Sequence, residues 1–136
     1  MALFSSPLSQ SPALLNLSGF ATLMPLALGV IGTVSPAAAL KIFDFDDKTL
    51  NPQARKLGTN LMLFQSSRDL FMAGVNLAGW WYGDRKMLGI ISFLGCAVAI
   101  NDGWMSERQL GRGAWKHVAW VPVVASLGAA LMGWFD

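Results

Sequence analysis

The sequence predicts an all-α protein, a four-helix transmembrane bundle that forms a single domain over residues 1–136. Hydrophobic residues make up 54% of the chain and charged residues only 13%, whereas a soluble domain carries roughly 25% charged residues to cover its surface. Four apolar stretches also follow one another, each near the ~20 residues that cross a ~30 Å hydrocarbon core as a helix. The predicted helices cover residues 14–38, 57–82, 86–104 and 114–135.

The first stretch, "LLNLSGFATLMPLALGVIGTV", carries Pro25 near its centre, and we expect a kink there. The run is long and no Lys or Arg precedes it. These flanks favour a retained membrane helix over a signal peptide cleaved at "SPAAALK".

The other three stretches have ends typical of membrane helices. The second follows "NPQARK" and closes on "GWWYGDRK", whose aromatic residues resemble an interfacial belt. The third, "MLGIISFLGCAVAIN", is the least polar. The fourth runs from Trp115 to Trp134 and is aromatic at both ends.

Basic residues predict the orientation of the helices. Seven of them lie in or beside the two loops that follow the first and third stretches: Lys41, Lys48, Arg55, Lys56, Arg108, Arg112 and Lys116. The opposite side has only Arg85 and Lys86. Because cytoplasmic loops carry the excess of Lys and Arg, we expect both basic loops to be cytosolic in an integral protein of the endoplasmic reticulum.

Composition excludes several classes of function. The net charge is only +2 and the basic residues form no stripe, so no nucleic-acid partner is expected. Cys96 is the single cysteine and His117 the single histidine, which excludes an internal disulfide and an ordinary zinc site. The carboxylates show no calcium-loop spacing. We therefore expect no metal and no cofactor.

The second stretch carries a polar stripe at membrane depth. Gln65, Asp69, Met72 and Asn76 are spaced i, i+4, i+7 and i+11, which places them on one face of a helix, with Arg68 beside that face. A charge at the bilayer centre costs about 2.5–3.5 kcal/mol, so it needs a partner or a purpose. Lipid cannot satisfy these groups, and the stripe should therefore face the bundle interior.

Further polar residues lie toward the cytosolic side. Asn101 and Asp102 precede the expected exit of the third helix, where Gly103 should loosen it, and His117 opens the fourth. We expect Arg68, Asp69, Asp102 and His117 to converge on one cavity open toward the cytosol.

A purely structural role remains the alternative for each of these residues. Arg68 and Asp69 neutralise each other in that reading, Asp102 caps a loop or pairs with Arg112, and His117 is interfacial. As a group they favour a site, because two carboxylates, an arginine and a histidine exceed what holding four helices together requires.

This set suits general acid–base chemistry. In the predicted site Asp102 is the base for water or a hydroxyl and Asp69 the acid, or the reverse, while Arg68 balances the charge. Side chains that bind substrate or orient water complete the site: His117, Gln65, Asn76 and Asn101. An Asp–Arg–Asp arrangement resembles, in chemistry and not in fold, the limonene-epoxide-hydrolase type of enzyme, which opens epoxides without a covalent intermediate.

Four short motifs carry a family resemblance: "RDL" at 68–70, "GDRK" at 83–86, "NDG" at 101–103 and "WKH" at 115–117. In their order and spacing the chain resembles small fungal four-helix integral membrane proteins catalogued as a domain of unknown function. Some relatives resemble tailoring enzymes of polyketide or terpenoid biosynthesis. The resemblance implies a site role for Arg68, Asp69, Asp102 and His117, and no cofactor.

The leading hypothesis is thus a cofactor-independent epoxide hydrolase or cyclase of secondary metabolism, whose lipophilic substrate enters from the lipid bilayer. A non-catalytic membrane scaffold or assembly protein is the alternative. A small transporter is less favoured, because the four helices show no clear inverted repeat. A homo-oligomer is left open.

Overall fold

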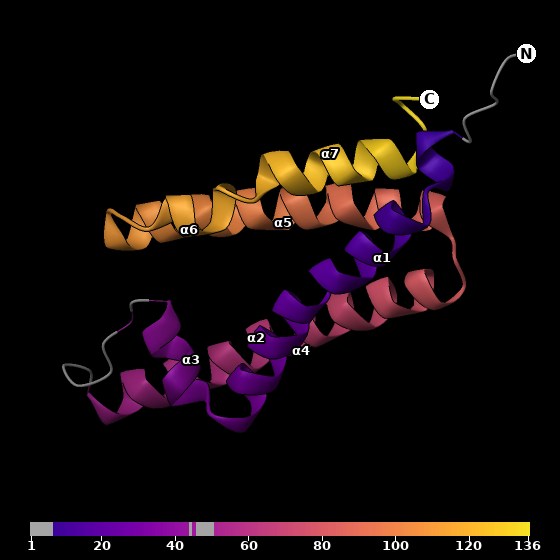
Figure 1. Ribbon diagram of the computed structural model, residues 1–136. Helices are drawn as coiled ribbons and strands as arrows, with labels where there is room; N and C mark the ends of the chain where they lie inside the picture. Colours follow the sequence, from indigo (N-terminus) through magenta and orange to yellow (C-terminus); the bar gives the residue numbers. More distant parts are fainter. Residues whose placement is uncertain (1–6, 44, 46–50) are drawn as a thin grey trace, which may run out of the picture. The chain divides into compact units, whose positions relative to one another are not determined.

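The computed structural model describes residues 7–43, 45 and 51–136, and all regular elements in this part of the chain are helices (Figure 1). They are a 3-10 turn η1 (Leu8–Gln10) and the α-helices α1 (Pro12–Ala21), α2 (Leu23–Val34), α3 (Pro36–Ile42), α4 (Pro52–Trp81), α5 (Arg85–Leu110), α6 (Ala114–Val118) and α7 (Val121–Leu131). The all-α class is confirmed. Lys48, one of the basic residues used for the orientation, lies outside the described residues.

Three helical segments in the described residues are long and apolar enough to cross a membrane. They are Pro12–Val34, which joins α1 and α2, Arg85–Leu110, which is α5, and Ala114–Leu131, which joins α6 and α7. These segments support an integral membrane protein. The predicted second span is also a helix, α4, but it is not among the three, because charged and amide side chains interrupt its apolar sequence.

Prolines explain where the observed helices depart from the predicted ranges. The helix is interrupted at Thr22, because Pro25 has no N–H to bond the carbonyl of residue 21. The helix predicted to reach residue 38 ends at Val34, since Pro36 disfavours a helical Ser35, whose φ is −142°. Pro122 also lacks the N–H of a helical residue, and the helix breaks there between α6 and α7.

The third predicted helix is longer than expected. α5 continues through Gly103 to Leu110, so Asn101 and Asp102 lie within the helix and not at a loosened end. The helix instead stops at Gly111, which takes a left-handed φ of 63° and donates its N–H to the Glu107 carbonyl at 2.8 Å. A glycine in this conformation is a common helix stop.

The chain divides into two compact units. Unit 1 comprises Met1–Phe20 with Ala78–Asp136, and unit 2 comprises Ala21–Leu77. In unit 1, α5 lies along α6 and α7 (Figure 1). Its buried core is Leu88, Leu127 and Leu131, with Leu14, Leu15 and Trp80 packed against it.

Two glycines allow α5 and α7 to approach closely. A Cβ added at Gly89 would lie 2.9 Å from the Gly128 carbonyl oxygen, and one added at Gly128 would lie 3.1 Å from the Gly89 carbonyl oxygen. Both oxygens belong to the backbone and cannot move aside as a side chain can, so the helices have no room for a larger residue there. Small residues at the contact are the usual means by which membrane helices pack.

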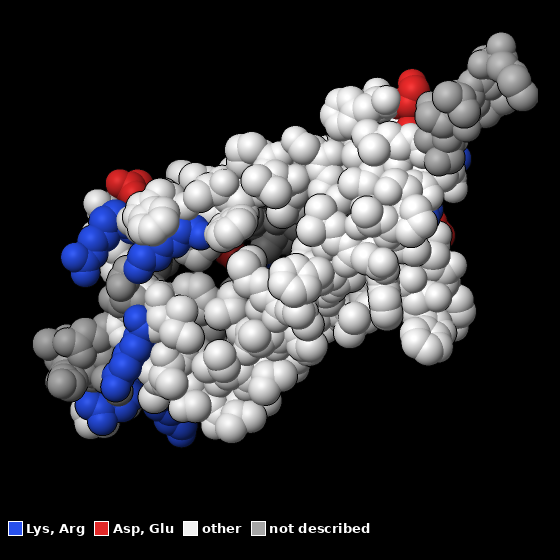
Figure 2. Space-filling view, in the orientation of Figure 1, with Lys and Arg blue, Asp and Glu red and all other residues white. Residues whose placement is uncertain are grey.

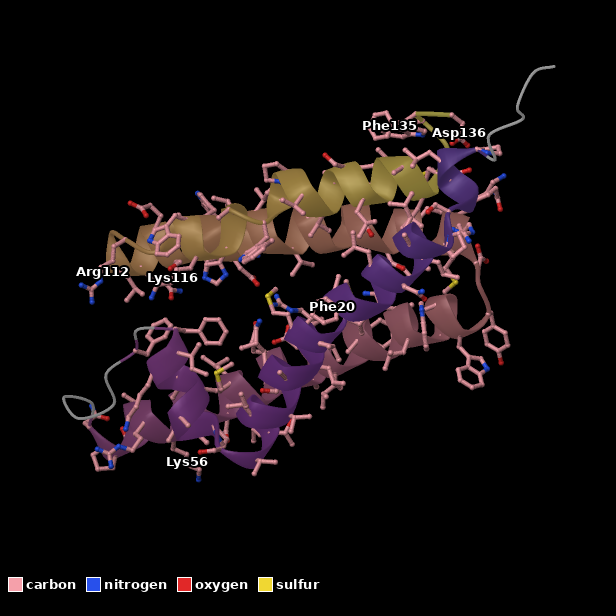
Figure 3. The ribbon with its side chains drawn as sticks, viewed as in Figure 1. Phe20, Lys56, Arg112, Lys116, Phe135 and Asp136 are labelled. Atoms are coloured by element: carbon pink, nitrogen blue, oxygen red, sulfur yellow. The ribbon has the colours of Figure 1, made fainter. Side chains whose placement is uncertain are left out.

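Polar contacts tie η1 to the end of unit 1 where α5 begins and α7 ends. The Asp136 carboxylate accepts hydrogen bonds from the Ser9 N–H, at 2.8 Å, and from the Ser9 hydroxyl. These bonds hold the pKa of Asp136 below its usual value. Arg85 Nη1 donates to the carbonyls of Ser9 and Ser11 at 2.9 and 2.8 Å. Figure 3 labels Phe135 and Asp136 beside this turn.

In unit 2, α2 packs against α4 through small residues. A Cβ at Gly29 would lie 2.7 Å from Leu70 Cγ and 3.0 Å from the Leu70 backbone nitrogen, and one at Gly32 would collide with the Ser66 hydroxyl. Ser66 is fully buried, and its hydroxyl donates to the Met62 carbonyl at 2.7 Å. This contact fixes which face of α4 is covered by α2.

Candidate functional site

An ion pair lies near the middle of α4. Arg68 Nη2 and Asp69 Oδ1 are 3.5 Å apart, and the two side chains are 33% and 13% exposed. At 1.5 Å per residue, Arg68 is about 24 Å along the helix from Pro52. The two charges predicted at membrane depth therefore form a pair within unit 2.

The polar stripe of α4 lies beside the face that α2 covers. Gln65, Asp69 and Asn76 are all half-buried. At about 100° per residue they share one face, and the buried Ser66 and Ala73 lie about 60–80° around the helix from its centre. The Asn76 side-chain amide donates to the Met72 carbonyl at 3.2 Å, which holds it against its own helix.

Another face of α4 is apolar and exposed. Its large side chains are Leu57, Leu61, Phe64 and Phe71, with exposed fractions between 57% and 74%. Exposed large apolar groups of this kind suit contact with lipid. α4 thus combines a lipid-compatible face with a polar one, even though its mean composition is less apolar than that of the three candidate spans.

In unit 1, α6 brings His117 next to the Asp102 region of α5. Gly103 makes this approach possible, since a Cβ there would lie 3.2 Å from the Ala114 carbonyl oxygen and 3.6 Å from His117 Cβ. Asp102 and His117 are half-buried, and Asn101 is exposed. His117 thus lies on the part of α6 that packs against α5 at Gly103, the residue after Asp102.

The structure thus groups the predicted site residues in two sets. Unit 2 holds Arg68 and Asp69 with Gln65 and Asn76, and unit 1 holds Asp102 and His117 with Asn101. The convergence of both sets on one cavity stays a prediction, as do the roles of the individual residues. Among the described residues, no group of three or more His, Cys, Asp or Glu is placed to hold a metal ion.

Two polar features escaped the sequence interpretation. Ser66 follows Gln65 but faces α2, and only its spacing of seven residues from Ala73 hints at a shared buried face. Arg85 served in the sequence analysis only to predict the orientation of the helices. In the structure its guanidinium donates hydrogen bonds to carbonyls 74 and 76 residues away. Nothing local in the sequence marks such a long-range contact.

Comparison with models of protein families found a match over most of the chain. The model of the family described as "Domain of unknown function (DUF4267)" matches residues 22–131, a range that contains all seven predicted site residues. Neither the curated proteins nor the solved structures gave a match.

Proposed function

The chain belongs to the DUF4267 family, and we propose that it is a membrane-embedded acid–base enzyme that opens or cyclises an epoxide on a lipophilic polyketide- or terpenoid-like substrate. The observation that carries the proposal is the Arg68–Asp69 ion pair halfway along α4, beside a row of half-buried amides. Ionisable residues inside membrane segments are rare and mark functional sites by default.

The proposal includes a four-helix arrangement in which α4 joins the three apolar segments as the remaining span. Its 30 residues extend about 45 Å, which is ample for a ~30 Å hydrocarbon core. The exposed apolar face of α4 would meet lipid and the polar stripe would face inward. In this arrangement both basic loops are cytosolic and the protein resides in the endoplasmic reticulum.

The ion pair favours one order of the two carboxylate roles. A guanidinium beside a carboxylate stabilises its charged form, which suits a base, and Arg68 contacts Asp69. Asp69 then removes a proton from water while the water oxygen bonds to an epoxide carbon. The C–O bond of the epoxide breaks, and Asp102 donates its proton to the leaving oxygen. Return of the proton from Asp69 to Asp102 through solvent restores the enzyme.

The same site supports hydrolysis and cyclisation. Attack by water gives a diol, whereas attack by a hydroxyl of the substrate gives a cyclic ether, and neither reaction requires a redox partner. His117, beside Gly103 in α5, would orient the epoxide oxygen toward Asp102. Gln65, Asn76 and Asn101 supply amides that bind substrate oxygens.

A non-catalytic scaffold is the second candidate, and one observation favours it. Arg68 bonds its own sequence neighbour, and such a pair also neutralises two charges without any substrate. Close glycine contacts, such as Gly29 against Leu70, equally suit a protein whose task is helix assembly.

A single-turnover experiment in ¹⁸O-labelled water distinguishes the epoxide-opening enzyme from the scaffold. The full chain, reconstituted in vesicles and present in excess, is mixed with epoxides of a long-chain fatty acid ester and of an acyclic terpenoid. Direct attack by water gives a diol that carries the label in the first turnover, whereas an intermediate ester with Asp69 or Asp102 would give an unlabelled diol. Absence of any diol or cyclic ether above the level of protein-free vesicles would favour the scaffold.

A further inference from the structure

The geometry points to a second function at the end of unit 1 where α5 passes into α6: recognition of anionic phospholipid headgroups. The basic turn, as we name it, consists of Arg108, Arg112 and Lys116 with the indoles of Trp104 and Trp115. Figure 2 shows Lys and Arg side chains at this end of α5 and α6. This inference is independent of the proposed catalytic function.

The backbone of the basic turn is held in a defined shape. Gly111 and Gly113 both adopt left-handed conformations, with φ of 63° and 94°, so Arg112 lies at the tip between them. Its carbonyl accepts a hydrogen bond from the Ser106 hydroxyl at 3.2 Å. The turn therefore presents Arg112 without further ordering, and Figure 3 shows Arg112 and Lys116 projecting from this end.

Indoles place the basic turn at the depth of lipid headgroups. Trp104 is 56% exposed and Trp115 is 67% exposed. The guanidinium carbon of Arg108 lies 5.3 Å from the centroid of the Trp104 ring, a cation–π contact that keeps the charge next to the indole. Tryptophan prefers the membrane interface, so the adjacent cations lie at the level of lipid phosphates.

The opposite end of unit 1 is built differently. Arg85 and Arg108 are 23 residues apart on α5, which corresponds to about 35 Å and hence to the two surfaces of a ~30 Å hydrocarbon core. Arg85 donates to the carbonyls of Ser9 and Ser11, so its guanidinium serves the protein itself. Asp136 adds a carboxylate to that end.

Charge complementarity identifies the ligand as an anionic lipid. Within residues 104–116 the three cations of the basic turn are accompanied by one carboxylate, that of the exposed Glu107, so this segment is net positive. A cation close to an anionic leaflet contributes about a fivefold preference for that surface. A zwitterionic headgroup offers no such gain, because its own ammonium group offsets its phosphate.

Tryptophan fluorescence tests this inference in the full chain. The reporter protein has Trp80, Trp81 and Trp134 replaced by Phe, which leaves Trp104, Trp115 and Trp120 as the fluorophores toward the basic turn. It is reconstituted in phosphatidylcholine vesicles that contain a fixed fraction of a brominated lipid, either phosphatidylserine or phosphatidylcholine. The reciprocal reporter, with Trp104, Trp115 and Trp120 replaced by Phe, reads the other end.

We expect brominated phosphatidylserine to quench the first reporter more strongly than brominated phosphatidylcholine, corresponding to a relative binding constant of about fivefold or more. Arg108→Gln with Arg112→Gln should remove the excess, high salt should reduce it, and the control Lys86→Gln should leave it unchanged. Equal quenching by the two brominated lipids, or an excess that persists in the double variant, would overturn the inference.

Discussion

Replacing either Asp69 or Asp102 with asparagine is expected to reduce epoxide opening by about 10²–10⁴-fold, the range that a positioned acid or base contributes. Asparagine keeps the shape of the side chain but can neither accept nor donate the proton. The double variant should be little worse than either single variant, because both groups serve one step. The measurement is product formation under single-turnover conditions, with thermal unfolding as the check on the fold.

The matched control for this pair is Glu107→Gln, which removes an exposed carboxylate on the same helix as Asp102. Its rate should stay within about twofold of the parent, since it touches no reacting group. Full activity in both Asp69→Asn and Asp102→Asn would refute the assignment of the carboxylates and favour the scaffold function.

Gly89→Ala is expected to lower the free energy of unfolding by about 1–3 kcal/mol, as overpacking of a tight contact does. The added methyl group would lie 2.9 Å from the Gly128 carbonyl oxygen and 2.5 Å from Met132 Cγ, so α5 and α7 must move apart. Titration with a denaturing detergent in mixed micelles measures the loss.

The same substitution at Gly74 serves as the control. A Cβ there meets no atom of the described residues within 4 Å, and Gly74 lies inside α4. Alanine should therefore raise stability by up to about 1 kcal/mol through its better helix propensity. Equal effects at Gly74 and Gly89 would mean that α5 and α7 do not cross at the glycines.

Much of the fold follows from local sequence. Apolar length predicts where helices lie, and each observed helix overlaps a predicted stretch or its flank. The breaks at Thr22 and Ser35 and between α6 and α7 follow from the chemistry of proline. The glycine contacts do not, because a glycine in an apolar helix gives no sign of which other helix it will touch.

The candidate site is predictable to a similar extent. Helical periodicity alone places Gln65, Asp69 and Asn76 on one face of α4. The sequence left open which aspartate is the base, and the proposed mechanism gives that role to Asp69, which pairs with Arg68. The Ser9–Asp136 bond joins residues 127 apart, and no local pattern predicts a contact over that separation.

Crosslinking in native membranes tests whether Asp69 and Asp102 serve one site, as the proposed mechanism requires. Asp69→Cys and Asp102→Cys are combined in a Cys96→Ala background, which removes the single native cysteine, and treated with a short bifunctional thiosulfonate. The control pairs Phe71→Cys with Asp102→Cys, since Phe71 lies about 200° around α4 from Asp69. We expect efficient crosslinking within one chain for the first pair and little for the control. No crosslink between positions 69 and 102, or equal yields for both pairs, would contradict it.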